Sequence, residues 1–155
     1  MELDREKAPV TVANFLAHVR ADFYNGLIFH RAEPGFVVQA GYYTADDRRA
    51  RTSADPIANE SENGLSNLRG TVAMARTDYP HSATTQFFIN LVDNQKLDRA
   101  QYADGWGYAV FGYVTEGMDV VDSIAQGPTT RRLRENFWPV DPVVITRAYV
   151  QGDDQ

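Results

Sequence analysis

The strongest constraint on the fold is a series of short runs rich in β-branched and aromatic residues. Such runs are typical of β-strands, because branched and aromatic side chains pack well on a pleated, half-buried surface. Glycine, proline or polar residues separate the runs, as expected where one strand turns into the next. The six runs occupy residues 26–31, 35–41, 70–76, 86–92, 108–114 and 142–150. So many short strands predict a closed barrel or a sandwich.

Two other segments carry the 3.6-residue apolar period of an amphipathic helix. In the first, residues 8–24, the apolar face consists of Val12, Phe15, Leu16 and Val19. In the second, residues 117–128, it consists of Met118, Val121 and Ile124. Pro9 suits the first turn of a helix, and Gly127 followed by Pro128 is a stop signal. The chain is therefore predicted to be mainly β with two helices.

The longest polar stretch, residues 43–67, has few apolar residues and several that form turns. We expect a surface excursion there, because a loop of this length is uncommon in compact domains and usually has a function. At 155 residues the chain suits one domain, and no repeat or linker divides it. Residues 1–155 are expected to form that single domain.

Composition excludes several classes of function. The chain has 21 acidic and 15 basic residues and a formal charge of −6, which argues against nucleic acid as a partner. It has no cysteine, so disulfides, thiolate nucleophiles and cysteine-based zinc sites are excluded. No apolar run approaches the roughly 18 residues of a membrane span, and the N-terminal residues lack a signal-peptide pattern. We expect a soluble protein with no membrane partner.

The three histidines lie in patterns that offer little chemistry. His18 falls off the apolar face of the first helix and is expected to be solvated. His30 lies in a predicted strand without a second metal ligand nearby, so a satisfied structural histidine is expected. His81 precedes Ser82 and two threonines, which makes a serine hydrolase a rival hypothesis. No nucleophile elbow or phosphate-binding glycine loop accompanies it, and neither a metal nor a cofactor is expected.

What remains is a set of apolar and amide residues around one arginine, Arg31. Such a set suits rotation about an Xaa-Pro amide, a reaction that needs no nucleophile, base or metal. Its barrier of about 18–20 kcal/mol comes from resonance in the C–N bond. The prolyl nitrogen regains a lone pair in the twisted amide, so a charged, planar donor stabilises the transition state selectively. No nearby acid obviously claims Arg31, which would be explained if its partner is the substrate.

Three stretches carry a resemblance to a known family. FHRAEPGFVVQAG (29–41), GTVAMARTDYPHSATTQFFINLVDN (70–94) and GWGYAVFGYVTEGMDVVDSI (105–124) resemble, in this order, segments of the cyclophilin peptidyl-prolyl cis/trans isomerases, in their bacterial branch. The resemblance implies a closed eight-stranded antiparallel barrel capped by two helices, with the site on its outer face. It also implies an enzyme that rotates Xaa-Pro bonds in proline-containing polypeptides and assists their folding.

The resemblance also implies roles for individual residues. Arg31 and Gln39 would be catalytic, with Gln39 holding both the arginine and the substrate backbone. The proline socket would be lined by Phe36, Val37, Phe88 and Leu97. Further substrate contacts would come from the main chain of Ala75 and Arg76, and from Gln86 and Tyr108.

Three features depart from this pattern or strain it. Strict alternation along a strand would put Phe36 and Val37 on opposite faces, so both reach the site only if Gly35 permits an irregular start. Lys96 stands where the family has an aromatic residue, which opens the socket and implies weak binding of cyclosporin. The family's first strand has no counterpart here, so the barrel is expected to lack it.

A second function stays open at this point. The same fold could serve as a module or chaperone that binds proline segments without accelerating rotation, although such a module has no need of Arg31. We expect a monomer that accepts many proline-containing clients, because main-chain contacts ignore the side chain before proline. Resemblance to exported bacterial members favours the periplasm over the cytoplasm.

Overall fold

The protein is described by a computed structural model, which covers residues 1–46, 54–133 and 135–152. Its elements are β1 (Glu2–Leu3), α1 (Pro9–Arg20), β2 (Leu27–Glu33), β3 (Val37–Thr44), β4 (Thr71–Met74), β5 (Phe87–Asn90), the 3₁₀ helix η1 (Gln95–Leu97), β6 (Val110–Tyr113), α2 (Met118–Gln126), β7 (Thr129–Arg132) and β8 (Glu135–Pro139). The predicted mainly β fold with two helices is confirmed. None of the helices in the described ranges is long and apolar enough to cross a membrane.

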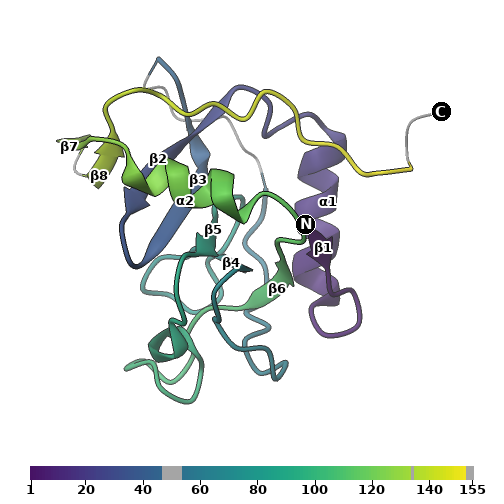
Figure 1. The fold of residues 1–155 in the computed structure, drawn as a ribbon. Helices are drawn as coiled ribbons and strands as arrows, with labels where there is room; N and C mark the ends of the chain where they lie inside the picture. Colours follow the sequence, from purple (N-terminus) through teal and green to yellow (C-terminus); the bar gives the residue numbers. More distant parts are fainter. Residues whose placement is uncertain (47–53, 134, 153–155) are drawn as a thin grey trace.

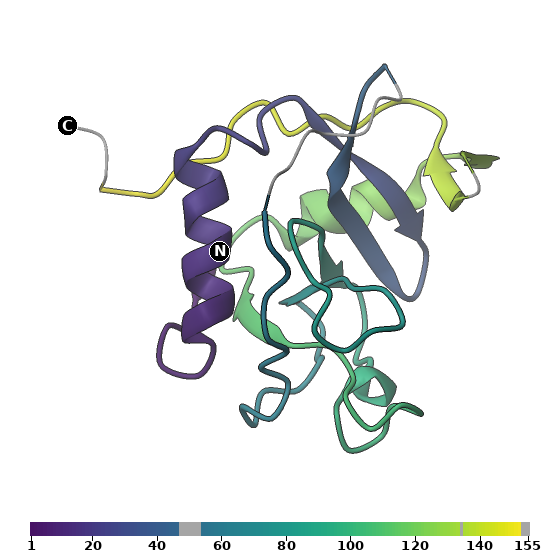
Figure 2. The ribbon, with the colours of Figure 1, turned by 180° about the vertical axis from the view of Figure 1, so that it is seen from behind.

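The strands form one antiparallel sheet of six strands in the order β1-β6-β4-β5-β3-β2, and β7 pairs with β8 in a separate hairpin. In Figures 1 and 2, α1 and β1 lie on one side of the molecule and this hairpin lies on the other. The C-terminal segment, drawn in yellow, runs from the hairpin across to α1. Strands β2 to β6 overlap, in order, the first five of the six predicted runs, and the last run contains no regular strand.

The last run, residues 142–150, lies along β2 without forming a regular strand. Its one bridge joins Val144 to Ile28. The Phe29 amide donates to the Val143 carbonyl at 3.0 Å, and the Ile145 amide donates to the Leu27 carbonyl at 2.8 Å. The run thus covers the outer edge of β2 only near Ile28.

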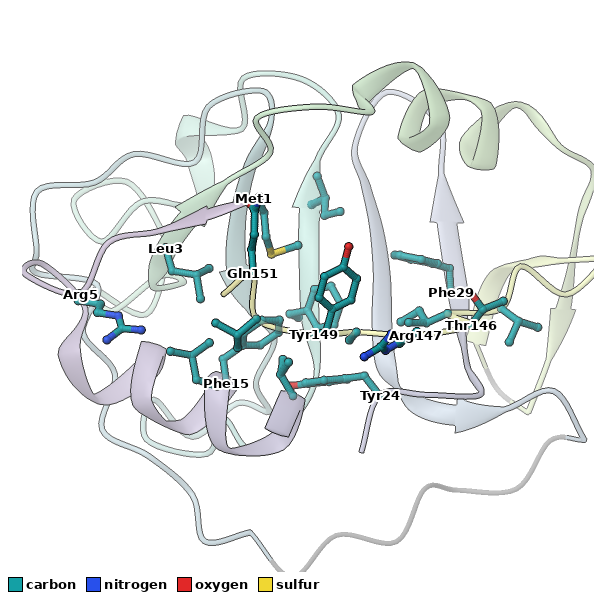
Figure 3. A pocket seen from close by; sticks show the side chains of 18 residues that line it. Met1, Leu3, Arg5, Phe15, Tyr24, Phe29, Thr146, Arg147, Tyr149 and Gln151 are labelled. Carbon is teal, nitrogen blue, oxygen red and sulfur yellow. The ribbon is translucent and has the colours of Figure 1, made fainter. Parts of the chain in front are cut away.

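The closed eight-stranded barrel implied by the resemblance is not what the structure has. Among the described residues the six-stranded sheet stays open, because β1 is only two residues long and the C-terminal segment pairs with β2 instead. A groove of about 760 Å³ lies along this opening. Figure 3 shows Leu3 of β1, Phe15 of α1 and Tyr149 of the C-terminal segment among the residues around it. The expected lack of a first strand stays a prediction.

Helix α1 forms as its apolar period predicts. Val12, Phe15, Leu16 and Val19 are all buried in the main core, and Pro9 occupies the first turn. The residue before the helix, Ala8, has no side chain that could cap the free amides. The Glu60 carboxylate caps them instead, since it accepts hydrogen bonds from the amides of Val10 at 3.0 Å and Thr11 at 2.8 Å. The polar stretch thus supplies a helix cap from a distance of 50 residues along the chain.

The rest of that polar stretch only partly matches the predicted excursion. Tyr43 and Thr44 belong to β3, and Ile57 forms a bridge with Ala83. Residues 47–53, in the middle of the predicted loop, lie outside the described residues.

The β7–β8 hairpin was missed by sequence analysis, because its polar and charged residues show no apolar alternation. Its anchor is Trp138, which is 1% exposed and packs against Tyr43 with 5.0 Å between ring centroids. Ile28 of β2 completes this small cluster, so the hairpin covers one end of the β2–β3 pair. Helix α2 contributes Val121 and Ala125 to the main core.

Replacing Phe111 with alanine tests the core. Its ring is fully buried and lies 5.2 Å from that of Phe15. We expect Phe111→Ala to lower the free energy of unfolding by about 3–5 kcal/mol, because it loses apolar burial and leaves a cavity. Val120, which is 60% exposed on α2, provides the control. Val120→Ala should change stability by no more than about 0.5 kcal/mol in the same urea titration. Equal losses in the two variants would contradict this placement of the core.

Candidate active site

The register of the sheet brings the predicted catalytic residues into one row. Arg31 of β2 pairs with Gln39 of β3, and Gln39 pairs with Phe88 of β5. Phe88 also pairs with Ala73 of β4, which pairs with Val110 of β6. Directly paired residues of antiparallel strands point to the same face. The row therefore places an arginine, an amide and an apolar surface side by side.

An apolar cluster separate from the main core occupies this face. Its buried members are Val37, Ala73, Phe88, Leu97 and Val110, and its partly buried members are Phe36, Leu65, Ala75, Tyr102 and Tyr108. The structure thus gathers all of the predicted socket residues into one cluster. None of them lines the groove of Figure 3, so that groove and the candidate socket are different places.

Phe36 and Val37 both reach the cluster because β3 begins only at Val37. Gly35 adopts a left-handed conformation with φ of 69°, which glycine tolerates without strain. The Phe36 amide donates to the Glu33 carbonyl at 3.1 Å, so Phe36 closes a turn and does not continue the strand. The irregular start that sequence analysis required at Gly35 is therefore present.

Arg31 has an acidic partner, contrary to the sequence-based interpretation. Its guanidinium forms an ion pair with Glu33, two residues along the same strand and on the same face. The Arg31 and Glu33 side chains are 32% and 25% exposed, so the pair lies at the surface of the site. The guanidinium carbon also lies 5.5 Å from the centroid of the Phe36 ring. The sequence interpretation overlooked this partner, because i and i+2 are adjacent only in an extended chain.

Gln39 is bound differently from the role that the resemblance implies. Its Nε2 donates to Oε1 of Gln86 at 2.9 Å, whereas Arg31 is paired with Glu33. The Gln86 carbonyl in turn accepts a hydrogen bond from the Ala75 amide at 3.0 Å. Gln39, Gln86 and Ala75 therefore form a chain of hydrogen bonds that links β3, β5 and the end of β4.

Arg76 forms a wall of the site through its side chain, which sequence analysis did not anticipate. This side chain is 3% exposed and forms an ion pair with Asp104. Its guanidinium carbon lies 4.7 Å from the centroid of the Tyr108 ring, and its Nε donates to the Gly107 carbonyl at 2.9 Å. Burial raises the pKa of Tyr108 to about 12, so its phenol is neutral at ordinary pH. The Arg76 side chain is thus an internal support rather than a free cation.

Comparison with known proteins identifies the family. A family model described as cyclophilin type peptidyl-prolyl cis-trans isomerase/CLD matches residues 1–150. The chain belongs to this cyclophilin-type family. "Peptidyl-prolyl cis-trans isomerase cyp18" of Streptomyces antibioticus is 52% identical over 98% of this chain and 92% of its own length. "Peptidyl-prolyl cis-trans isomerase B" of Escherichia coli is 50% identical, over 90% of this chain and 85% of its own length.

Solved structures agree on the fold of this cyclophilin-type chain. A crystal structure of a Cryptosporidium parvum cyclophilin type peptidyl-prolyl cis-trans isomerase, determined in the presence of the dipeptide Ala-Pro, has a TM-score of 0.74. It is 23% identical, and the match covers 94% of this chain and 87% of that one. The family recognised from three sequence stretches is thus confirmed, and so is its activity of rotating Xaa-Pro peptide bonds.

Next to the candidate socket of this cyclophilin-type chain lies a buried polar network that sequence analysis missed. Asn94 donates through Nδ2 to the Phe36 carbonyl and to Oδ1 of Asn90, both at 2.9 Å. Asn90 donates to Oδ1 of Asn67 at 3.1 Å, and Asn67 donates to Oδ1 of Asp98 at 2.9 Å. Buried amides bonded to each other in this way hold the Phe36 backbone in place. Isolated asparagines carry no periodic signal that could have revealed the network.

The rival hydrolase lacks the geometry that it needs. Nδ1 of His81 accepts the Asn59 amide at 3.0 Å, and its ring packs on Trp106. Ser82 donates its hydroxyl to the Tyr79 carbonyl at 2.7 Å and accepts the Thr77 amide at 2.9 Å. The histidine and the serine are therefore bound to other groups, with no hydrogen bond between them. Within the described ranges, no three or more His, Asp or Glu side chains form a group that could hold a metal ion.

His30 is buried, as expected of a structural histidine. Its ring nitrogens, however, lack the hydrogen bonds that sequence analysis predicted. Its side chain is 0% exposed. The centroid of its ring lies 5.0 Å from that of Tyr43 and 6.0 Å from that of Trp138. Neither ring nitrogen has a hydrogen-bond partner among the described residues. Burial, together with the nearby charge of Arg31, lowers the pKa of His30 to about 4. Polar groups of Ile28 and Gln86 oppose this shift only in part.

The buried neutral His30 makes the fold sensitive to acid. In the unfolded chain His30 has an ordinary pKa of about 6.5, so the unfolded state binds more protons between pH 6.5 and 4. The free energy of unfolding should therefore fall as pH drops through this window, by roughly 3 kcal/mol from this residue. A His30→Phe variant cannot take up this proton. Its stability should depend less on pH, as measured by urea denaturation from pH 7 to 4. Parallel curves for the two proteins would refute a role for His30.

Proposed function

We propose that Arg31 and Gln39 carry the isomerase activity of this chain and that the second apolar cluster binds the proline. The observation that supports this best is the registered row, in which Arg31 pairs with Gln39 and Gln39 pairs with Phe88. The Arg31 guanidinium carbon also lies 5.5 Å from the centroid of the Phe36 ring. A proline ring seated against Phe36 and Phe88 would bring its nitrogen within reach of that guanidinium. The apolar socket consists of Phe36, Val37, Phe88 and Leu97, with Tyr108 at its side.

In this mechanism Arg31 acts as a charged hydrogen-bond donor. The planar Xaa-Pro amide has little electron density on nitrogen, whereas the twisted amide has a lone pair there. A donor aimed at that lone pair stabilises the transition state more than either planar form. Glu33 does not prevent this role, because a guanidinium has five N–H donors and the ion pair with Glu33 uses only part of them.

The substrate backbone before proline would be held at the other end of β5. The Ala75 amide already donates to the Gln86 carbonyl, so the Ala75 carbonyl and the Arg76 amide are the groups proposed to bind the peptide. Gln39 is held by Gln86 and would position its amide against the same backbone. These contacts involve main-chain groups of the substrate, so many proline-containing polypeptides would be accepted.

Removing the arginine tests the proposal. Arg31→Ala should lower kcat/KM for the cis-to-trans relaxation of a short Ala-Pro-Phe peptide by about 100-fold, the usual loss for one transition-state donor. Arg5→Ala removes an arginine from the loop before α1 and serves as the matched control, with activity close to the parent. Circular dichroism should show that both variants are folded. A folded Arg31→Ala variant with full activity would exclude the proposed role.

The same experiment separates the isomerase from the second function, a module that only binds proline segments. Such a module would bind the peptide without accelerating its relaxation, and removal of Arg31 would change little.

We propose further that the protein is a monomeric single domain that assists the folding of proline-containing clients. We also propose that it binds neither nucleic acid nor membranes. Of the two bacterial compartments, periplasm and cytoplasm, we favour the periplasm.

Cyclosporin is proposed to bind weakly, because Lys96 stands where an aromatic wall is usual in the family. The Lys96 ammonium instead lies 4.7 Å from the Phe36 centroid. We expect a dissociation constant well above the nanomolar range by titration calorimetry. A Lys96→Trp variant should bind at least about tenfold more tightly, because an aromatic ring adds apolar contact area. Nanomolar binding by the parent, or no gain in the variant, would refute this proposal.

A further inference from the structure

Lys96 lies at the rim of the socket, and sequence analysis considered it only as the loss of an aromatic wall. It belongs to the short helix η1, directly before the buried socket residue Leu97. Its side chain is exposed, and its Nζ lies 4.7 Å from the centroid of the Phe36 ring. A cation in contact with the socket would also be in contact with any peptide bound there.

The other cations near the socket already have carboxylate partners. Arg31 is paired with Glu33, and Arg76 is paired with Asp104. Lys96 forms no ion pair with any carboxylate in the described part of the chain, and its contact with Phe36 is a cation–π contact. The nearest acids along the chain are used elsewhere: Asp98 accepts three hydrogen bonds from Ser66 and Asn67, and Asp93 accepts the Arg69 amide. Of the three cations named here, Lys96 is therefore the one without a carboxylate partner in the described part of the chain.

The register shows which part of a bound peptide would meet Lys96. Ala75 and Gln86, the proposed contacts for the residue before proline, lie next to the Phe87 end of β5. Val37, next to Phe36, pairs with Asn90 at the other end of the same strand. The four residues of β5 span about 13 Å. A proline ring seated on Phe88 would therefore lie between the two ends of this strand. The residue that follows proline would therefore point toward Lys96.

We propose that Lys96 makes the enzyme prefer substrates in which an acidic residue directly follows proline. This inference rests on the socket and peptide direction given under the proposed function. The overall charge of −6 opposes an acidic peptide only weakly, because charges farther than a Debye length of about 8 Å are screened at physiological salt. A carboxylate next to Lys96 lies well inside that distance, so the local cation decides the preference.

A peptide pair tests the preference directly. Ala-Ala-Pro-Glu-Phe and Ala-Ala-Pro-Gln-Phe, both with blocked ends, differ by one charge and have nearly the same shape. We expect kcat/KM from NMR exchange measurements at physiological salt to be about 2- to 5-fold higher for the glutamate peptide, the usual size of an exposed ion pair. The ratio should approach 1 at high salt.

Variants of the two lysines show whether Lys96 is the cause. Lys96→Met should abolish the ratio, and Lys96→Glu should invert it. Lys7→Met removes the only other lysine, on the loop before α1, and should keep the parent ratio. A ratio of 1 in the parent, or the same ratio in the parent and in Lys96→Met, would overturn the proposal.

A second readout keeps this test independent of the catalytic assignment. Dissociation constants of the two peptides can be measured by chemical-shift titration of Arg31→Ala, whether or not that variant is active. Tighter binding of the glutamate peptide there would support the role of Lys96. Equal binding would refute it, even if Arg31 proves to be the catalytic residue. If the parent accelerates neither peptide, the catalytic assignment fails and the binding ratio still decides the role of Lys96.

Discussion

The alternation of side chains along β3 and β5 is the constraint on which the rest of the structure depends. One set of residues, with Val38, Phe87 and Ile89, faces the main core beneath α1. The neighbouring residues Gln39 and Phe88 face the opposite side and meet Arg31 across the strand register. A shift of the register by one residue would exchange the two sets. Core packing therefore fixes the site, because the core face cannot be exposed without a large loss of stability.

The polar groups around the proposed socket act as its frame. The buried amides of Asn67, Asn90 and Asn94 satisfy one another and hold the Phe36 carbonyl, so the ring that forms one wall has a fixed backbone. On another side the Arg76 guanidinium packs on Tyr108 and is neutralised by Asp104. The proposed proline socket would need such a rigid frame, because rotation is accelerated only if the twisted amide fits better than the planar one.

Among the described residues, the charges around this frame are distributed in pairs, with one exception. Glu33 neutralises the proposed catalytic arginine and Asp104 neutralises Arg76, whereas Lys96 is left with the Phe36 ring. His30, next to Arg31 in β2, stays neutral because it is buried among aromatic rings. Strand β2 therefore carries a fully buried, neutral His30 directly beside the partly exposed ion pair of Arg31 and Glu33.

The sequence by itself determined the family, the two helices and most of the strands, because apolar periodicity and contiguous motifs are local properties of the chain. It also identified part of the apolar cluster that the structure gathers, namely Phe36, Val37, Ala75, Phe88, Leu97 and Tyr108. Only the tertiary structure decided that the described sheet is open, that Glu60 caps α1, and that Glu33, Gln86 and Asp104 are the partners of the site residues. Apart from the Arg31–Glu33 pair, which depends on the extended conformation of β2, these interactions join residues far apart in the chain. Their formation depends on register and packing, which no local pattern in the sequence specifies.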